Sequence, residues 1–152
     1  MKQFTGLELP PGKSAYIQYF SLQGTTVKIS GIAAYFGVDP STVTKTVHEL
    51  TREGYVEHEP YGGVALTDFG REYGAFLVRR HRILALVLSH YGLSEGEACQ
   101  EASRMESFLS RDAVNKMCRA LGHPTKGFCG DICHDPLCLT RTVQNGLSEN
   151  VS

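Results

Sequence analysis

Residues 27–67 read VKISGIAAYFGVDPSTVTKTVHELTREGYVEHEPYGGVALT and contain the most specific pattern in the chain. Residues 29–36 have apolar side chains at helical spacing, and Gly37 suits the left-handed position that ends a helix. Asp39 is a good N-cap residue, and Pro40 suits the first position of a second helix. The stretch therefore predicts two helices joined by a tight turn.

The second predicted helix, residues 41–50, has two faces of different character. Val43, Val47 and Leu50 recur at helical spacing and predict a buried face. The opposite face is small and polar, so it can enter the major groove of DNA and bond phosphates or base edges. The side chains expected in the groove are Ser41, Thr42, Thr44, Lys45 and Thr46.

A β-hairpin is predicted directly after this helix. Gly54 ends the helix, residues 55–59 alternate in polarity, and residues 64–66 return as the partner strand. The order helix, tight turn, polar helix and hairpin is typical of a winged helix-turn-helix that binds double-stranded DNA. The alternative is a helical hairpin beside a β-hairpin with no role in DNA binding. Further expected DNA contacts are Tyr61 and Gly62 at the wing tip, with Lys28 and Arg52 as positive groups.

The composition narrows the function classes. The chain has 152 residues, 41% hydrophobic content and a formal net charge of −1. Such a charge argues against a non-specific nucleic-acid coat protein, so any DNA affinity must come from a local patch. No apolar run has membrane length and no N-terminal signal is evident, so we expect a cytoplasmic protein without a membrane partner.

Helical patterns dominate the flanking segments. A short helix capped by Ser14 and bearing Leu22 among its apolar residues is expected before the DNA-binding unit. Thr67 is expected to cap a long helix from Asp68 to about Tyr91. The cluster at residues 79–82, Arg-Arg-His-Arg, interrupts the apolar stripe of this helix. Such a cluster usually forms a solvated face, and the alternatives are a contact with the DNA backbone or, for the histidine, a metal ligand.

Two further helices follow the Gly92 break, and their apolar stripes need a partner. The first stripe includes Met105 and Leu109. A second copy of the chain is the common partner in a dimeric regulator. The two DNA-binding domains of such a dimer would bind a palindromic DNA site. We therefore expect a mainly α protein with a small β-hairpin, in which a winged helix-turn-helix is followed by a helical dimerisation domain. The expected parts are a DNA-binding domain at 13–67, a long helix and dimerisation or metal-sensing domain at 68–122, a Cys-rich loop at 123–139 and a flexible tail at 140–152.

The chain resembles a known family over about residues 13–123. The closest likeness lies in GVDPSTVTKTVHELTREGYVEHEPYGGVALTDFGREYGAFLVRRHRIL, residues 37–84, and in the helix between residues 92 and 110. These segments resemble the iron- and manganese-dependent repressors related to diphtheria toxin repressor and the manganese transport regulator. The resemblance implies a homodimeric repressor whose DNA-binding heads are positioned by a transition metal, iron or manganese, bound between the first helix and the dimerisation helices.

The metal ligands implied by the resemblance are only partly present. His81 and Glu106 match family ligands. Cys99 lies on the same helix face as Glu106, so His81, Cys99 and Glu106 could form a three-ligand site. The alternative is a buried cysteine beside a structural His–Glu contact. Family ligand positions that carry other residues here are Ala15, Gln18, Ala85, Ser103 and Ser107.

A second metal signal lies in residues 127–138, GFCGDICHDPLC. The chain has five cysteines, an odd number, which favours metal or redox chemistry over a disulfide framework. A zinc site would use Cys118 or His134 with Cys129, Cys133 and Cys138. An iron–sulfur cluster would use Cys118, Cys129, Cys133 and Cys138. Free redox thiols, and a core position for Cys118, are the alternatives.

The leading prediction is a metal-responsive DNA-binding transcriptional regulator, a homodimeric repressor of metal-homeostasis genes. One alternative is an iron–sulfur or redox-sensing regulator that uses the C-terminal cysteines. Another is a structural zinc-binding interaction module, which would bind DNA only non-specifically. No nucleophile elbow, phosphate loop or metal-hydrolase motif occurs, so we expect no enzymatic activity.

Overall fold

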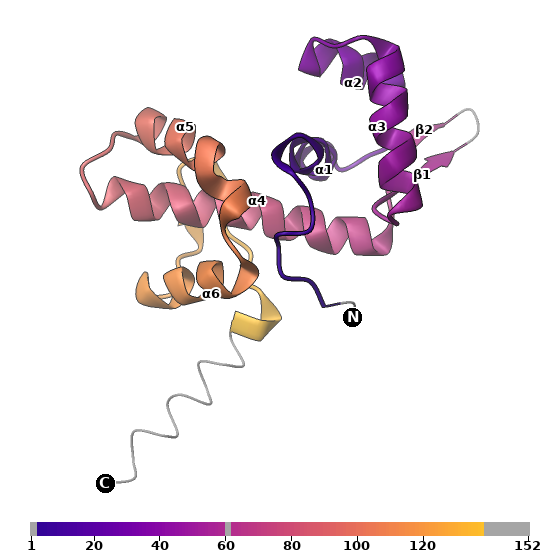
Figure 1. The fold of residues 1–152 in the computed structure, drawn as a ribbon. Coiled ribbons are helices and arrows are strands. Elements are labelled where there is room, and N and C mark those ends of the chain that lie inside the picture. Colours follow the sequence, from indigo (N-terminus) through magenta and orange to yellow (C-terminus); the bar gives the residue numbers. More distant parts are fainter. Residues whose placement is uncertain (1–2, 60–61, 139–152) are drawn as a thin grey trace, which may run out of the picture. The chain divides into compact units, whose positions relative to one another are not determined.

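Residues of the long helix α4, Asp68–Ser89 (Figure 1), belong to both of the compact units into which the chain divides. The structure, a computed structural model, describes residues 3–59 and 62–138. The first unit contains Gln3 and residues 9–78, and the second contains residues 4–8 and those from 79 onward. The division thus falls inside α4, between residues 78 and 79. The expected tail at 140–152 lies outside the described residues.

The first unit has the predicted winged helix-turn-helix order, followed by the first half of α4. Its helices and strands are α1 (Pro11–Gln23), α2 (Ile29–Phe36), α3 (Pro40–Arg52), β1 (Val56–Glu59) and β2 (Gly63–Leu66). The two strands pair antiparallel with Val56 opposite Leu66 and Glu59 opposite Gly63. The predicted fold class, mainly helical with a small hairpin, is confirmed.

The turn between α2 and α3 forms as the sequence predicts, with one difference. Gly37 takes a left-handed conformation with φ 64°, which residues with a side chain rarely adopt. Pro40 occupies the start of α3, where its missing N–H is no loss. Asp39 begins this helix through its backbone carbonyl, which accepts from the amides of Thr42 and Val43, and not through the predicted side-chain cap.

The core of the first unit includes the inner face of α3 and buried apolar residues of the other elements in this unit. The three apolar residues predicted to face inward on α3 are all buried. Gly70 allows α4 to begin close to the wing, because a Cβ there would lie 1.9 Å from the carbonyl oxygen of Tyr55. Buried apolar residues of this unit include Ile17, Phe20, Ile32, Val43, Val47, Leu50, Tyr55, Val64 and Tyr73.

The first helix differs from the prediction at both ends. α1 begins at Pro11, because Pro10 is extended and Pro11 suits the first turn, so Ser14 lies inside the helix and not at its cap. The Ser14 hydroxyl donates to the carbonyl of Leu9. Leu22, predicted on the apolar face, is 57% exposed because it falls in the last turn, beyond the buried stripe.

The second unit contains short helices that follow the second half of α4 along the chain. They are α5 (Glu95–Met105), the 3-10 turn η1 (Glu106–Phe108) and α6 (Arg111–Ala120), followed by the two-residue strands β3 (Lys126–Gly127) and β4 (Gly130–Asp131). Ser94 and Glu97 form a capping box that starts α5. Leu84 and Ala85 pack against Ala98 and Ala102, which joins α4 to α5.

The predicted stripe after Gly92 is interrupted by the 3-10 turn. α5 ends at Met105, whose side chain is 43% exposed, contrary to the inward position expected for it. Leu109 is extended and lies beyond the turn, yet it still packs against the core of the second unit. None of the helices in the described segments combines the length and apolar character needed to cross a membrane.

The arginine cluster of α4 is not the solvated face that the sequence predicted. Arg79 and Arg80 are only 5% and 1% exposed. One guanidinium nitrogen of Arg80 donates to the carbonyls of Gly6 and Leu109, at 2.9 and 3.2 Å. Arg80 thus fastens two chain segments of the second unit, and because both side chains are buried, neither is available to the DNA backbone.

Candidate DNA-binding surface and metal centres

The polar face of α3 lies at the surface of the first unit. Ser41, Thr42, Thr44 and Lys45 are exposed, whereas Thr46 is half-buried. The hydroxyls of Thr44 and Thr46 donate to the carbonyls four residues earlier, so toward an outside partner they can only accept. The other expected contacts, Lys28 and Arg52, are exposed, Gly62 is half-buried and Tyr61 lies outside the described residues. The DNA contacts stay predictions.

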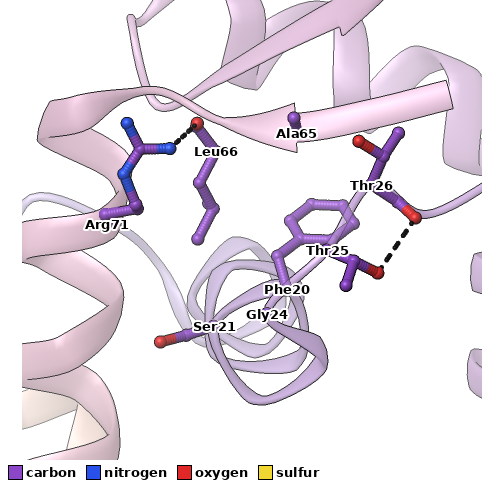
Figure 2. Close-up of a pocket in the computed structure, with 8 residues that line it drawn as sticks. All are labelled: Phe20, Ser21, Gly24, Thr25, Thr26, Ala65, Leu66 and Arg71. Atoms are coloured by element: carbon purple, nitrogen blue, oxygen red, sulfur yellow. Dashed lines mark hydrogen bonds between the residues drawn. The ribbon is translucent and has the colours of Figure 1, made fainter. Parts of the chain in front are cut away.

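A pocket of about 440 Å³ in the same unit lies between the end of α1 and strand β2 (Figure 2). Arg71 lines it and donates to the carbonyl of Leu66 at 3.0 Å. The same guanidinium also pairs with Asp68. This ion pair offsets the charge of Arg71, so Arg71 adds little to a positive DNA-binding surface.

A first group of metal-binding side chains comes together in the second unit. His81 on α4, Cys99 on α5 and Cys129 between β3 and β4 offer ligand atoms that all lie within 4.8 Å of one another. The Sγ atoms of Cys99 and Cys129 are 3.0 Å apart, and Nε2 of His81 is 3.9 Å from Sγ of Cys129. We refer to these three residues as the His81 group.

Glu106 supports this group from the other side of the imidazole ring. Its Oε2 atom lies 2.6 Å from Nδ1 of His81. The hydrogen bond to Glu106 raises the pKa of His81, although burial opposes it. A carboxylate on one ring nitrogen fixes the orientation of a histidine whose other nitrogen binds a metal. Glu106, predicted as a ligand, contacts the other ring nitrogen of His81, and Cys129 is the third residue whose ligand atom lies with those of His81 and Cys99.

The two thiols of the His81 group differ in their proton affinity. The hydrogen bond with Cys129, together with burial, raises the pKa of Cys99 to about 11. Burial alone would raise the pKa of Cys129, but hydrogen bonds with Cys99 and His81 and the charge of Arg82 lower it. Cys129 is thus the thiol that ionises first, as a metal ligand must.

A short hairpin brings Cys129 to this position. Arg82 donates to the carbonyls of Cys129 and Asp131, and thereby attaches the β3–β4 hairpin to α4. Gly130 has φ 144°, a backbone conformation that residues with a side chain rarely adopt, and a Cβ there would also lie 2.6 Å from the guanidinium of Arg82. Cys99 and Cys129 are 30 positions apart, so their proximity was not visible in the sequence. The only local signal was the Gly-Phe-Cys-Gly turn.

A second group lies around the end of α6. Cys118, His123 and Cys138 offer ligand atoms that also lie within 4.8 Å of one another, and both sulfurs are buried. Nδ1 of His123 is 3.5 Å from Sγ of Cys118 and 3.6 Å from Sγ of Cys138. Burial, and next the charge of Cys118, raise the pKa of Cys138. We refer to this set as the Cys118 group; sequence reasoning missed His123 as a member.

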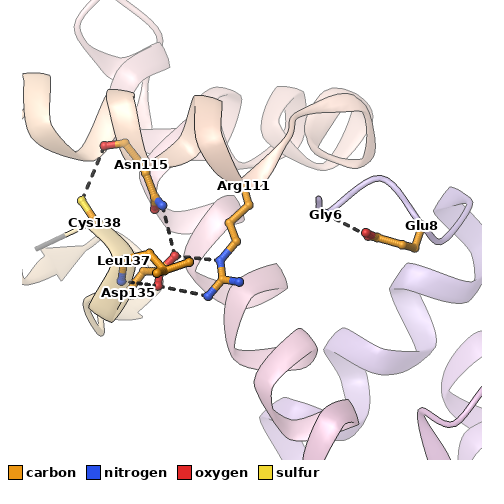
Figure 3. Close-up of polar contacts among 7 residues, drawn as sticks. All are labelled: Gly6, Glu8, Arg111, Asn115, Asp135, Leu137 and Cys138. Atoms are coloured by element: carbon orange, nitrogen blue, oxygen red, sulfur yellow. Dashed lines mark hydrogen bonds and ion pairs between the residues drawn. The ribbon is translucent and has the colours of Figure 1, made fainter. Parts of the chain in front are cut away.

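A polar network fixes the segment that carries Cys138 (Figure 3). Arg111 of α6 donates two hydrogen bonds to the carboxylate of Asp135, at 2.8 and 3.1 Å. Asn115 donates to the same carboxylate at 3.1 Å, and the amide of Leu137 donates to it at 3.0 Å. The thiol of Cys138 lies 3.6 Å from the carbonyl of Asn115, to which it donates. The segment is therefore held against α6, beside Cys118.

The four-cysteine site predicted from the loop is not assembled. Cys129 belongs to the His81 group, whereas Cys118 and Cys138 belong to the other group. Cys133 is exposed and is in neither group. The β3–β4 hairpin and the Asp135 network attach the loop at separate places, which separates its cysteines. In the described segments no group of thiols has the four members that the predicted iron–sulfur cluster requires.

Family models match both parts of the chain. Residues 19–64 match the model "iron dependent repressor, N-terminal DNA binding domain", and residues 67–134 match "iron dependent repressor, metal binding and dimerisation domain". The chain belongs to the iron-dependent repressor family. This family consists of metal-dependent transcriptional repressors, not enzymes. All residues of the two groups lie within the matched metal-binding and dimerisation domain except Cys138, which lies beyond it.

Curated members of the family include the HTH-type transcriptional regulator MntR. The protein from Geobacillus kaustophilus is 37% identical over 90 residues, which cover 59% of this chain and 64% of the relative. That from Lysinibacillus sphaericus is 34% identical over 90 residues, 59% of this chain and 65% of the relative. The alignments thus span less than two thirds of the length of these regulators.

Solved structures of similar fold extend the comparison. The hypothetical protein SSo2273 from Sulfolobus solfataricus has a TM-score of 0.68 at 24% identity, over 82% of this chain and 96% of that one. The repressor ScaR with bound Zn²⁺ has a TM-score of 0.67 at 26% identity, over 76% of this chain and 56% of ScaR. A manganese-dependent transcriptional repressor in complex with manganese has a TM-score of 0.65 at 26% identity, over 82% of this chain and 63% of that repressor.

Proposed function

We propose that this protein is a metal-responsive transcriptional regulator that acts as a homodimeric repressor on double-stranded operator DNA. The single observation that carries the proposal is the His81 group, a set of metal ligands within the domain that matches the family's metal-binding and dimerisation model. The family's DNA-binding model matches the unit that contains α3. Binding to chromosomal DNA would place the protein in the cytoplasm.

The donor set indicates which ions the His81 group prefers. One imidazole nitrogen and two sulfurs suit Zn²⁺ or a similarly thiophilic ion, whereas Mn²⁺ prefers oxygen ligands. Related proteins include one in complex with manganese and one with bound Zn²⁺. Because Ala15, Gln18 and Ala85 supply no carboxylate, we propose a zinc-type effector and not manganese. Three protein ligands leave one coordination position open, which suits reversible binding.

The regulatory step follows from the elements that carry the ligands. His81 lies on α4, Cys99 on α5 and Cys129 in the β3–β4 hairpin, so one ion would join three segments of the second unit. A bound ion supplies charge and directed bonds that favour the conformation in which these segments are close. If that conformation sets the spacing of two recognition helices in a dimer, metal and DNA binding stabilise each other.

A redox response is a second candidate function, favoured by the close approach of Cys99 and Cys129. Their sulfurs are 3.0 Å apart, and both side chains are at least partly accessible. Oxidation of this thiol pair to a disulfide would remove two of the three ligands of the His81 group. The His81 group would then respond both to the concentration of the metal and to that of the oxidant.

A DNA selection tests the proposed function. Random-sequence duplex DNA is incubated with the reduced protein in the presence of Zn²⁺ or of a chelator, and bound fragments are sequenced. We expect a two-fold symmetric sequence to be enriched with Zn²⁺ and much less with chelator. Equal enrichment in both conditions, or no enrichment above a variant with Lys45→Ala and Thr42→Ala, would contradict a metal-responsive DNA-binding function.

A further inference from the structure

We propose that Cys118, His123 and Cys138, with His134 as the fourth ligand, form a closed structural zinc site that fastens the C-terminal segment to α6. This site shares no residue with the His81 group. It would therefore bind its ion whether or not the His81 group responds to metal.

The distances in the Cys118 group fit a tetrahedral zinc ion. With Zn–S bonds of about 2.3 Å and Zn–N bonds of about 2.0–2.1 Å, tetrahedral angles separate a sulfur from a nitrogen by about 3.6 Å. Nδ1 of His123 lies 3.5 Å from Sγ of Cys118 and 3.6 Å from Sγ of Cys138. By the same geometry two sulfurs on one zinc are about 3.8 Å apart, well outside disulfide length. The three ligand atoms thus already outline one face of such a site.

His134, whose ring lies beside that of His123 but which is not among the three residues with ligand atoms within 4.8 Å of one another, is the proposed fourth ligand. Its ring centroid lies 5.7 Å from that of His123, with the rings near perpendicular. Its Nδ1 atom is buried and has no hydrogen-bond partner among the described residues. A buried polar nitrogen without a partner costs free energy, and coordination of an ion would remove that cost. Two thiolates and two imidazoles neutralise Zn²⁺, which suits a buried site.

The backbone near His123 points to the same conclusion. His123 has a positive φ of 54° and is the one described residue other than glycine with a positive φ. Such a conformation is costly unless the surroundings impose it. Here it follows Gly122 at the end of α6, where the amide of His123 donates to the carbonyl of Cys118 at 2.9 Å. This turn directs the imidazole of His123 back toward the sulfur of Cys118.

Apart from the contacts of Arg82 and Asp135, the segment after α6 has little core to hold it. Between residues 121 and 138 the buried side chains are Ile132, Asp135 and Cys138. A segment with so little core gains much of its stability from a cross-link, and metal binding energy then appears as folding energy. The Asp135 network holds Cys138 beside α6 (Figure 3). It therefore positions the sulfur of Cys138 as a ligand but supplies no ligand atom itself.

The test measures zinc retention in the full chain. Wild-type protein, His81→Ala and, each in the His81→Ala background, Cys138→Ser, His123→Ala and the control Cys133→Ser are purified under reducing conditions, dialysed against a weak chelator and analysed for zinc per chain. Cys133 is the matched control, because it is a thiol in the same segment outside both groups. We expect wild type, His81→Ala and Cys133→Ser to retain one zinc ion per chain, and Cys138→Ser and His123→Ala to lose it.

Cobalt substitution keeps the test decisive even if the ligand variants fail to fold. His81→Ala leaves the Cys118 group intact, so its Co²⁺ complex should show tetrahedral d–d bands and thiolate-to-cobalt charge transfer with an intensity corresponding to two sulfurs. A colourless or octahedral complex would overturn the proposal. So would retention of zinc by both Cys138→Ser and His123→Ala, or a Cys118–Cys138 disulfide that persists in wild-type protein purified under reducing conditions. A failure of metal-dependent DNA binding would concern only the His81 group.

Discussion

Nδ1 of His81 is hydrogen-bonded to Oε2 of Glu106 at 2.6 Å, while Nε2 of the same ring faces Sγ of Cys129 at 3.9 Å. The carboxylate therefore selects which ring nitrogen is free to bind a metal. Both side chains are largely buried, so the ring has little freedom to turn. The contact links η1, which follows α5, to α4 and orients the histidine before any ion arrives.

Glu106→Gln should weaken metal binding at the His81 group while leaving the ligands in place. Loss of an orienting carboxylate lowers metal affinity by roughly 10–100-fold. The measurement is a competition titration of Zn²⁺ with a chromophoric chelator. Glu101→Gln is the matched control, because Glu101 is an α5 carboxylate that pairs with Arg104 and not with His81. Equal affinity of Glu106→Gln and the control would show that Glu106 does not orient His81.

Lys45→Ala should weaken DNA binding and reduce its salt dependence. If Lys45 contacts a phosphate, the slope of log K against log salt should fall by about 1. Fluorescence anisotropy at several salt concentrations on the selected duplex measures both effects. Lys116→Ala is the control, because it removes the same charge from an exposed side chain of α6 in the second unit. An unchanged slope for Lys45→Ala would remove this residue from the interface.

Oxidation of the reduced, metal-free protein with diamide should join Cys99 to Cys129 and abolish binding of metal at the His81 group. Their 3.0 Å separation makes this pair the first to react, and Cys129 is the thiol with the lowered pKa. Peptide mapping by mass spectrometry identifies the disulfide. Prior saturation with Zn²⁺ should slow the reaction. Preferential formation of a bond that involves exposed Cys133 would argue against the observed pairing.

Acid should destabilise the second unit through Asp135. The carboxylate is buried, which alone would raise its pKa, but the hydrogen bonds from Arg111 and its neighbours lower it below the ordinary value. Because the folded pKa is lowered, this stabilisation is complete above the unfolded value of about 4. It is lost as the pH falls through the folded pKa. Urea unfolding of metal-free protein between pH 7 and pH 3 measures the loss.

The control for this pH effect is Asp135→Asn. It should be less stable than wild type at pH 7, because Arg111 would lose the charge of its partner, and the difference should shrink as the pH falls below 4. Removal of one member of a buried ion pair costs about 3–5 kcal/mol, and partial exposure of Arg111 reduces that figure. A stability difference that is independent of pH would contradict the role of the Asp135 charge.

The DNA-binding unit could be read from the sequence because local rules determine it. Gly37 and Pro40 fix the turn, and the spacing of Val43, Val47 and Leu50 fixes the inner face of α3. Each of these signals acts over a few residues, where helical periodicity and turn chemistry are decisive. The resemblance to the family extended the prediction of the fold to α4 and the dimerisation domain.

The metal groups could be predicted only in part, because they depend on contacts between distant residues. His81 and Cys99 were expected to share a site, but Cys129 joined them only through the β3–β4 hairpin and Arg82. His123 was missed because its role comes from a left-handed backbone turn. Burial of Arg79 and Arg80 was missed as well, since a local charge cluster carries no information on the carbonyls that will face it.

The most direct measurement of the central claim is a Zn²⁺ titration of operator affinity in wild-type protein and in His81→Ala. Anisotropy of the selected duplex is recorded as free Zn²⁺ is raised in a metal buffer under reducing conditions. We predict that Zn²⁺ tightens DNA binding by wild type at least tenfold, while His81→Ala keeps the weak affinity of the metal-free protein at all Zn²⁺ concentrations. Equal affinity of wild type with and without Zn²⁺, or an unchanged response in His81→Ala, would contradict the claim that the His81 group controls DNA binding.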